Sequence, residues 1–200
     1  ALAIKLCDAG VGDYWDDVDQ YVRNQLIEHQ MTDIELLAEV AGTGPRGEVN
    51  PPQSISGNVV DRCLGSFAST ASPTLIYPGW TICCPSNGAL GLYFAWEAIV
   101  RGGDSVAQVN LLLNRASPWL DIDSYLPYEG RVVMKTKTAK EVFVRIPRWV
   151  DKRAVESYVN GREVPQLWLN RYLILDELAE RDEVTLEFPV LEENVKYTIN

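Results

Sequence analysis

Apolar residues recur at helical spacing near the start of the chain. Over Gly12–Gln30 they form one face of a predicted amphipathic helix, with Asp13 as its N-cap and Asp16 in its acidic first turn. The residues that recur at helical spacing are Trp15, Val18, Val22, Gln25 and Leu26. Thr32–Ala41 predicts a second, shorter helix in which Thr32 and Glu35 form a capping box.

The stretch from Gly42 to Gly79 is rich in Gly, Pro, Ser and Thr. Loops of this length are uncommon inside a compact domain and are often functional. The composition favours a flexible linker, whereas scattered apolar residues favour an ordered loop anchored to a core. These residues are Val59, Val60, Phe67, Leu75, Ile76, Tyr77 and Trp80. Both interpretations stay open on the sequence.

The segment GWTICCPSNGALGLYFAWEAIV (residues 79–100) predicts a helix. Pro85 suits its first position, because a proline lacks the N–H that would be unpaired there. Apolar side chains then point in nearly every direction around the helix axis. The helix is therefore expected to be buried on all sides and to end at Gly102–Gly103.

Beyond Gly103 the period of the apolar residues changes to two, which is typical of strands. Short alternating runs are separated by turn residues, and Asn160-Gly161 is a hairpin signal. The runs are VAQVNLLL, WLDIDSYL, RVVMKTKT, EVFVRIP, ESYVNGREV, LWLNRYLIL and EVTLEFPV. They predict an antiparallel β-sandwich. The fold class is therefore α+β, with a helical domain over residues 1–103 and a sandwich domain over residues 104–200.

The composition is that of a globular protein, with 46% hydrophobic and 23% charged residues. The formal net charge of −10 argues against a nucleic-acid partner, since little in the chain would neutralise phosphates. No apolar run approaches the roughly 18 residues that a transmembrane helix needs, so no membrane partner is expected. The oligomeric state stays open, with a homo-oligomer among the options.

Four cysteines lack the Cys-x-x-Cys spacing of zinc fingers and thioredoxins. Cys83 and Cys84 are interpreted in three ways: as two core thiols, as a metal site, or as a partner in a bridge to Cys63. If Pro85 occupies the first helical position, Cys84 is the N-cap. There, unpaired N–H groups and the helix dipole favour a thiolate, which is both a nucleophile and a zinc ligand. Unpaired cysteines also favour a reducing, cytoplasmic location.

Four further residues are candidates for chemistry. His29 is the only histidine, and its place at the polar end of a helix disfavours a Cys-His catalytic pair. Glu97 interrupts an apolar run, so a buried carboxylate with a catalytic role is considered there. Asp121 and Asp123 alternate along one strand and are expected on its solvated face.

Two blocks of the chain resemble a known enzyme family. ICCPSNGALGLYFAWEAIV and the following VNLLLNRASPWLDIDSYLPYEGRVVMKTKTAKEVFVRIPRWV resemble the β-L-arabinofuranosidase-like proteins of glycoside hydrolase family 127. DAGVGDYWDDVDQYVRNQL resembles the helix that precedes the cysteine pair in these proteins. The resemblance implies that residues 1–103 are the last helices of an (α/α)6 barrel and that a β-sandwich follows.

The same resemblance implies a retaining hydrolase of a carbohydrate substrate with zinc as its cofactor. Cys83 would be the nucleophile and a zinc ligand, and Cys84 a second zinc ligand. In this family a Glu-x-Cys element supplies two more zinc ligands, and a general acid/base glutamate lies further upstream. KLCDAG lacks a glutamate two residues before Cys7, so the resemblance implies that these residues lie upstream of Ala1. The chain is therefore expected to be part of a longer enzyme and to be inactive alone. The alternative is a non-catalytic carbohydrate-binding or interaction module with structural cysteines.

Overall fold

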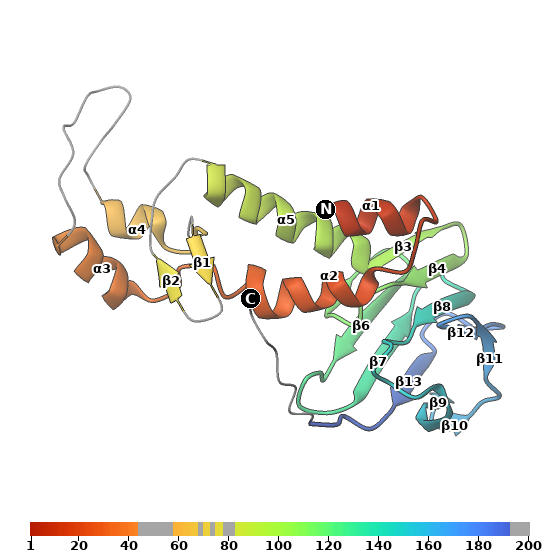
Figure 1. Ribbon diagram of the computed structural model, residues 1–200. Helices are drawn as coiled ribbons and strands as arrows, with labels where there is room; N and C mark the ends of the chain where they lie inside the picture. The colour runs from red at the N-terminus through yellow and green to blue at the C-terminus, as the bar shows by residue number, and fades with distance from the viewer. Residues whose placement is uncertain (44–57, 68–69, 73–74, 78–82, 193–200) are drawn as a thin grey trace. The chain divides into compact units, whose positions relative to one another are not determined.

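The computed structural model describes residues 1–43, 58–67, 70–72, 75–77 and 83–192 (Figure 1). These residues divide into two compact units. The first unit comprises Ala1–Lys5 and Asp17–Ala95, and the second comprises Leu6–Asp16 and Trp96–Asn200. No helix in the described part of the chain is long and apolar enough to cross a membrane.

Helices dominate the part of the chain before residue 100. They are α1 (Leu2–Asp8), α2 (Trp15–Tyr21), α3 (Ile34–Thr43), α4 (Val59–Cys63) and α5 (Cys83–Ile99). A π-helical turn over Val22–Leu26 continues α2 directly. The first unit also holds a small antiparallel sheet of β1 (Thr70–Ser72) and β2 (Leu75–Tyr77).

The amphipathic helix predicted over Gly12–Gln30 is confirmed by α2 and its π-helical continuation. Its predicted face is buried: Trp15, Val18 and Val22 are all less than a tenth exposed. The Asp13 carboxylate accepts a hydrogen bond from the Trp15 backbone N–H at 3.3 Å, which satisfies one of the free donors at the start of the helix.

The second predicted helix exists as α3, but its predicted cap is wrong. Asp33, rather than Thr32, accepts hydrogen bonds from the backbone N–H groups of Glu35 at 2.9 Å and Leu36 at 3.0 Å. Asp33 lies directly before the first helical residue, Ile34, so its carboxylate reaches two unpaired donors at once. Thr32 lies one residue too early to do the same.

The described parts of Gly42–Gly79 contain regular structure, which favours the ordered-loop interpretation for those residues. Besides α4, β1 and β2, Phe67 forms an isolated antiparallel bridge with Gln30. The Met31 N–H donates to the Ser66 carbonyl at 2.8 Å, and the Gly65 N–H donates to the Met31 carbonyl at 2.7 Å. Residues 44–57, 68–69, 73–74 and 78–82 lie outside the described residues.

The prediction that α5 is buried on all sides is wrong. Leu90, Tyr93 and Trp96 recur every three residues and are each about half exposed. The buried side of the helix is made of Ala95, Ala98 and Ile99. The helix also ends at Ile99 rather than at Gly102–Gly103, because Val100 begins a strand that pairs with Val109.

Strands make up most of the second unit, as the period-two pattern predicts. They are β3 (Val100–Gly103), β4 (Val106–Val109), β5 (Arg115–Ala116), β6 (Leu120–Ser124), β7 (Arg131–Thr136), β8 (Glu141–Arg145), β9 (Glu156–Val159), β10 (Arg162–Glu163), β11 (Leu167–Leu169), β12 (Tyr172–Leu175) and β13 (Glu183–Glu187). The run LWLNRYLIL forms two strands, β11 and β12, since Asn170 has a positive φ and turns the chain.

Two sheets account for these strands. One has the order β10-β9-β13-β7-β6-β5 and the other the order β11-β12-β8-β4-β3. Every pair is antiparallel except β4 with β8, which run parallel. The predicted α+β class with antiparallel-rich sheets is therefore confirmed, while the (α/α)6 barrel and the detailed sandwich packing stay predictions.

Alternation along the strands builds the core of the second unit. In β7 and β13 every second side chain is fully or almost fully buried, while the residues between them are more exposed. The buried members are Val132, Met134, Thr136, Val184 and Leu186. The predicted hairpin at Asn160-Gly161 is confirmed, because both residues have positive φ and β9 pairs with β10.

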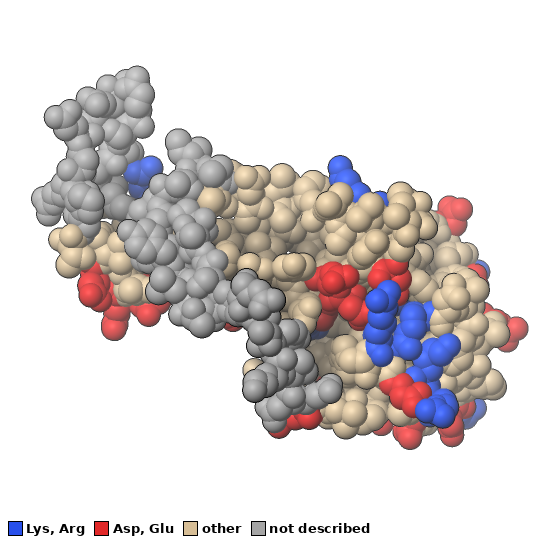
Figure 2. Space-filling view, viewed as in Figure 1, with Lys and Arg blue, Asp and Glu red and all other residues tan. Residues whose placement is uncertain are grey.

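A buried guanidinium ties residues 6–16 to the sheets of the second unit. Arg145, at the end of β8, is only 2% exposed and donates to both carboxylate oxygens of Asp13 at 2.9 Å. It also donates to Asp16, at 2.6 Å and 3.3 Å. Arg148 adds a hydrogen bond to the Asp13 carbonyl at 2.6 Å. Figure 2 shows acidic and basic side chains lying side by side in this unit.

Burial alone would lower the pKa of Arg145, because desolvation disfavours a charged group. The hydrogen bonds that it donates to Asp16 and Asp13 outweigh this effect and raise the pKa of Arg145 above its ordinary value. The cation is therefore stabilised by its two carboxylate partners. The sequence pattern places Asp13 and Asp16 at the helix start and gives no sign of their partner Arg145.

Replacement of Arg145 by Met should destabilise the protein because it leaves two part-buried carboxylates without their cation. We expect Arg145→Met to lower the free energy of unfolding by about 2–4 kcal/mol, measured by urea denaturation. Arg148→Met is the matched control: its side chain is 60% exposed, so a loss below about 1 kcal/mol is expected. Equal losses for the two variants would show that the Arg145 pairs do not hold the segment.

Candidate functional site

The two neighbouring cysteines open helix α5. The helix begins at Cys83, so both cysteines lie in its first turn, and the expectation that Cys84 is the N-cap is wrong by two residues. Pro85 still fits, because the first four N–H groups of a helix have no partner within the helix. Cys84 is half-buried, whereas the side chains of Cys83 and Pro85 lie outside the described residues.

Gly88 lets an aromatic ring contact the first turns of α5. A Cβ atom built on Gly88 would overlap the Cβ and Cγ atoms of Phe67, which lie close to the backbone and cannot swing away. Phe67 is itself buried and is held by its bridge to Gln30. The glycine therefore sets how closely the segment around Phe67 approaches the helix that carries the cysteines.

Gly91, one turn later, faces a different neighbour. A Cβ atom at Gly91 would lie 3.5 Å from Leu26 Cδ2, which is an ordinary van der Waals contact. Gly91 also lines a cavity of about 570 Å³ in the first unit. The other lining side chains are mostly apolar, with Val22 and Leu26 among them, and His29 adds one imidazole.

The last turn of α5 is capped by an arginine from β5. Arg115 donates to the backbone carbonyls of Trp96, Glu97 and Val100 at 2.5–3.1 Å, and its guanidinium lies 4.3 Å from the Trp96 ring centroid. A cation at this position satisfies free carbonyls and interacts favourably with the helix dipole.

Cys7 and Cys63 are half-buried thiols without a disulfide, so the proposed bridge to Cys63 is not formed in the described structure. Burial raises the pKa of the Cys7 thiol, and this outweighs the hydrogen bond that it accepts from the Tyr14 N–H at 3.1 Å. Burial likewise raises the pKa of the Cys63 thiol, with Arg62 opposing the shift. Both thiols are therefore poor nucleophiles at neutral pH.

The acidic candidates lie on the surface. Glu97 is exposed, so the expectation of a buried carboxylate there is wrong: it lies on the open side of α5. The prediction that Asp121 and Asp123 occupy a solvated strand face is confirmed. Asp121 forms an ion pair with Lys137 at 2.6 Å, and Asp123 is exposed.

A metal centre needs several ligands close together. Within the described residues, no group of three or more His, Cys, Asp or Glu side chains could hold a metal ion. The Cys83 side chain is not among those residues. Cys83 and Cys84 as zinc ligands, and Cys83 as a nucleophile, therefore stay predictions.

Comparisons with known proteins find similarity only among solved structures. No family model matches the chain, and no curated protein matches it. The structure is similar to a glycoside hydrolase family 127 β-L-arabinofuranosidase from Geobacillus stearothermophilus T6, with 20% identity over 55% of this chain and a TM-score of 0.45.

Two further solved structures are similar over a comparable range. One is a family 127 β-arabinofuranosidase, with 20% identity, 63% of this chain covered and a TM-score of 0.46. The other is described as a glycoside hydrolase, with 22% identity, 62% covered and a TM-score of 0.45. The similar region spans only 20–25% of the length of these three proteins. The chain thus resembles family 127 proteins over part of its length, and this likeness by itself decides nothing about activity.

The two glycines of α5 should respond in opposite ways to a methyl group. We expect Gly88→Ala to lower the free energy of unfolding by about 1–3 kcal/mol, because the Phe67 ring must be displaced. Gly91→Ala should be neutral or stabilising by up to about 1 kcal/mol, because alanine is the better helix former and has room. Thermal or urea unfolding of the two variants measures this. A destabilised Gly91→Ala beside an unaffected Gly88→Ala would contradict the packing described.

Proposed function

We propose that this chain is part of a retaining glycoside hydrolase that acts on β-L-arabinofuranosides or related glycosides, with Cys83 as its nucleophile. The observation that carries the proposal is the position of Cys83 and Cys84 in the first turn of a 17-residue helix. The unpaired N–H groups and the positive end of the helix dipole at such a turn favour a thiolate over a thiol. The sequence around them supplies the resemblance to family 127.

The reaction proposed for Cys83 has two steps. In the first, the Cys83 thiolate attacks the anomeric carbon, a C–S bond forms and the glycosidic C–O bond breaks, while a general acid gives its proton to the leaving oxygen. In the second, a water molecule loses a proton to the same group, now a base, and attacks the anomeric carbon, which releases the thiolate. Two inversions leave the configuration unchanged, so the hydrolase is retaining.

Zinc is proposed as the cofactor of the whole enzyme, with Cys83 and Cys84 among its ligands. The described residues do not complete such a site, since zinc in proteins is almost always bound by four ligands and no group of three is found among them. In line with the resemblance to family 127, the remaining ligands and the general acid are proposed to lie upstream of Ala1. The chain matches only 20–25% of the length of the solved glycoside hydrolases, which is consistent with that division.

The alternative is a carbohydrate-binding or interaction module in which the cysteines are structural. The half-buried state of Cys84 favours it, because a free cysteine often serves as a small core residue. The two proposals differ in whether the Cys83 sulfur has a chemical role.

Loss of the Cys83 sulfur should abolish turnover in the full-length protein that contains this chain. With an aryl β-L-arabinofuranoside as substrate, we expect Cys83→Ala to lower kcat/KM by about 10³-fold or more, because no covalent intermediate can form. The isolated 200-residue chain should show no turnover. Cys63→Ala is the matched control and should keep the activity within about twofold, since its thiol lies outside the proposed reaction. Full activity of Cys83→Ala would exclude the nucleophile.

Thiol reactivity tests the same proposal without a substrate. We expect Cys83 to react with iodoacetamide at pH 7 faster than Cys7 and Cys63, because burial raises the pKa of these two thiols and keeps them protonated. For each of them the thiolate fraction, and with it the rate, should rise as the pH increases towards the raised pKa. Peptide mass spectrometry at timed intervals separates the sites. Equal and slow labelling of all three would favour the module with structural cysteines.

A further inference from the structure

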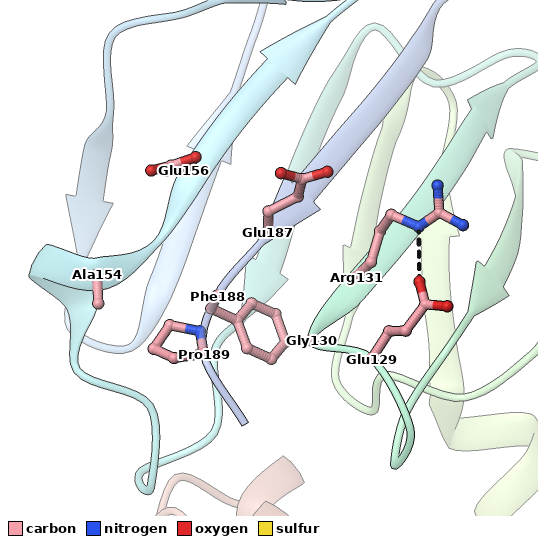
Figure 3. Close-up of a pocket in the computed structure, with 8 residues that line it drawn as sticks. All are labelled: Glu129, Gly130, Arg131, Ala154, Glu156, Glu187, Phe188 and Pro189. Atoms are coloured by element: carbon pink, nitrogen blue, oxygen red, sulfur yellow. Dashed lines mark ion pairs between the residues drawn. The ribbon is translucent and has the colours of Figure 1, made fainter. Parts of the chain in front are cut away.

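A pocket of about 370 Å³ lies on the sheet of the second unit, away from the cysteines in sequence. It is formed where β7, β9 and β13 run side by side (Figure 3). The lining side chains that matter here are Glu129, Arg131, Glu156, Glu187, Phe188 and Pro189. The pocket therefore combines charged groups with the exposed Pro189, while Phe188 is only 6% exposed.

Three charged residues form a row across the strands of this pocket. Glu187 of β13 lies directly opposite Glu156 of β9 on one side and directly opposite Arg131 of β7 on the other. Direct cross-strand partners share one face of a sheet, so the two carboxylates are neighbours. Like charges in this arrangement destabilise a sheet. Arg131 on the other side of Glu187 supplies the opposite charge, so the row places two carboxylates and one guanidinium side by side on one face.

The Glu156 carboxylate is held in place by a neighbouring phenol. The Tyr158 hydroxyl donates to Glu156 Oε2 at 2.7 Å. This hydrogen bond to a carboxylate is the main cause that raises the pKa of Tyr158 to about 12. The phenol therefore stays protonated at neutral pH, and it leaves the other oxygen of Glu156 able to accept from a ligand.

Arg131 supplies donors to the same pocket. Its Nε lies 3.4 Å from Glu129 Oε2, and its guanidinium stacks on the Tyr125 ring at 3.9 Å. Among the described residues, the buried Arg131 Nε has no hydrogen-bond partner, and no hydrogen bond is found from its terminal nitrogens or to Glu187. The pocket thus presents both hydrogen-bond acceptors and hydrogen-bond donors that lack a protein partner there.

This donor and acceptor set fits hydroxyl groups better than it fits a cation. A hydroxyl both donates and accepts, so it can pair with a carboxylate and with a guanidinium at once. A metal ion would be repelled by Arg131, and no group of three acidic, His or Cys side chains among the described residues could hold one. Apolar surface beyond the lining of the pocket comes from the half-exposed Trp149 ring, which packs edge-on against the buried Phe188 at 5.8 Å.

We propose that this pocket binds one neutral sugar residue of a glycan, as a binding subsite on the sheet unit that is separate from the cysteine pair. The carboxylates of Glu156 and Glu187 accept from the sugar hydroxyls, and Arg131 donates to them. The exposed Pro189, with the half-exposed Trp149 ring nearby, contacts the apolar face of the sugar ring. Few contacts in a small pocket give weak binding, with a Kd of about 1–10 mM.

Titration of the ¹⁵N-labelled chain with arabinobiose, xylobiose and cellobiose, followed by amide chemical shifts, tests this inference. At least one disaccharide should shift the amides of β9 and β13 in a saturable way. Glu187→Gln should weaken that binding about fivefold or more, because a neutral amide accepts hydroxyl protons less strongly.

Glu183→Gln is the matched control. Glu183 lies on the same strand, outside the pocket and opposite Lys135, so binding should change less than about twofold. Trp149→Ala should also weaken binding. The inference is overturned if no disaccharide shifts these amides at about 50 mM, well above the expected Kd, if Glu187→Gln and Glu183→Gln behave alike, or if Ca²⁺ or spermidine binds there in place of sugars. Sugar binding at this pocket goes beyond the proposed function. Cys83→Ala should leave this binding unchanged, so the binding proposal and the hydrolase proposal can fail independently.

Discussion

The buried cation of Arg145 links residues 6–16 to the end of strand β8. Arg145 is almost fully buried, and a buried guanidinium is stable only when carboxylates neutralise it and its N–H groups are hydrogen-bonded. Asp13 and Asp16 meet both needs, which draws residues 6–16 onto the sheet unit although more than 100 residues separate them from β8. The position at which α2 begins follows from this pairing, because Asp13 also receives the Trp15 N–H.

Helix α5 carries Cys83 and Cys84, the residues proposed to act in catalysis, and two contacts fix its position. Gly88 permits the Phe67 ring to approach, and Arg115 satisfies the carbonyls at the far end. The cysteines therefore lie on a helix that is held near both of its ends. The sheet unit offers a second, independent chemistry in the row Glu156, Glu187 and Arg131, where carboxylates and a guanidinium lie side by side on one face.

Local patterns predicted most elements, and the failures have identifiable causes. The amphipathic face of Trp15, Val18 and Val22 and the hairpin at Asn160-Gly161 depend on neighbours in sequence, so both could be predicted. The burial of α5 could not: its apolar residues point in all directions, and only the structure shows that Leu90, Tyr93 and Trp96 form the more exposed side. Composition alone likewise could not place Glu97 on the surface.

The sequence by itself determined the order of elements, helices first and strands after, together with the cysteine pair at a helix start, because periodicity and capping are local properties. Only the tertiary structure decided which distant charges meet. The pairing of Arg145 with Asp13 and Asp16 depends on strand register and on the burial of the segment that carries them. The neighbouring Glu156 and Glu187 likewise arise from the alignment of β9 with β13, since register brings together residues that no short sequence window contains.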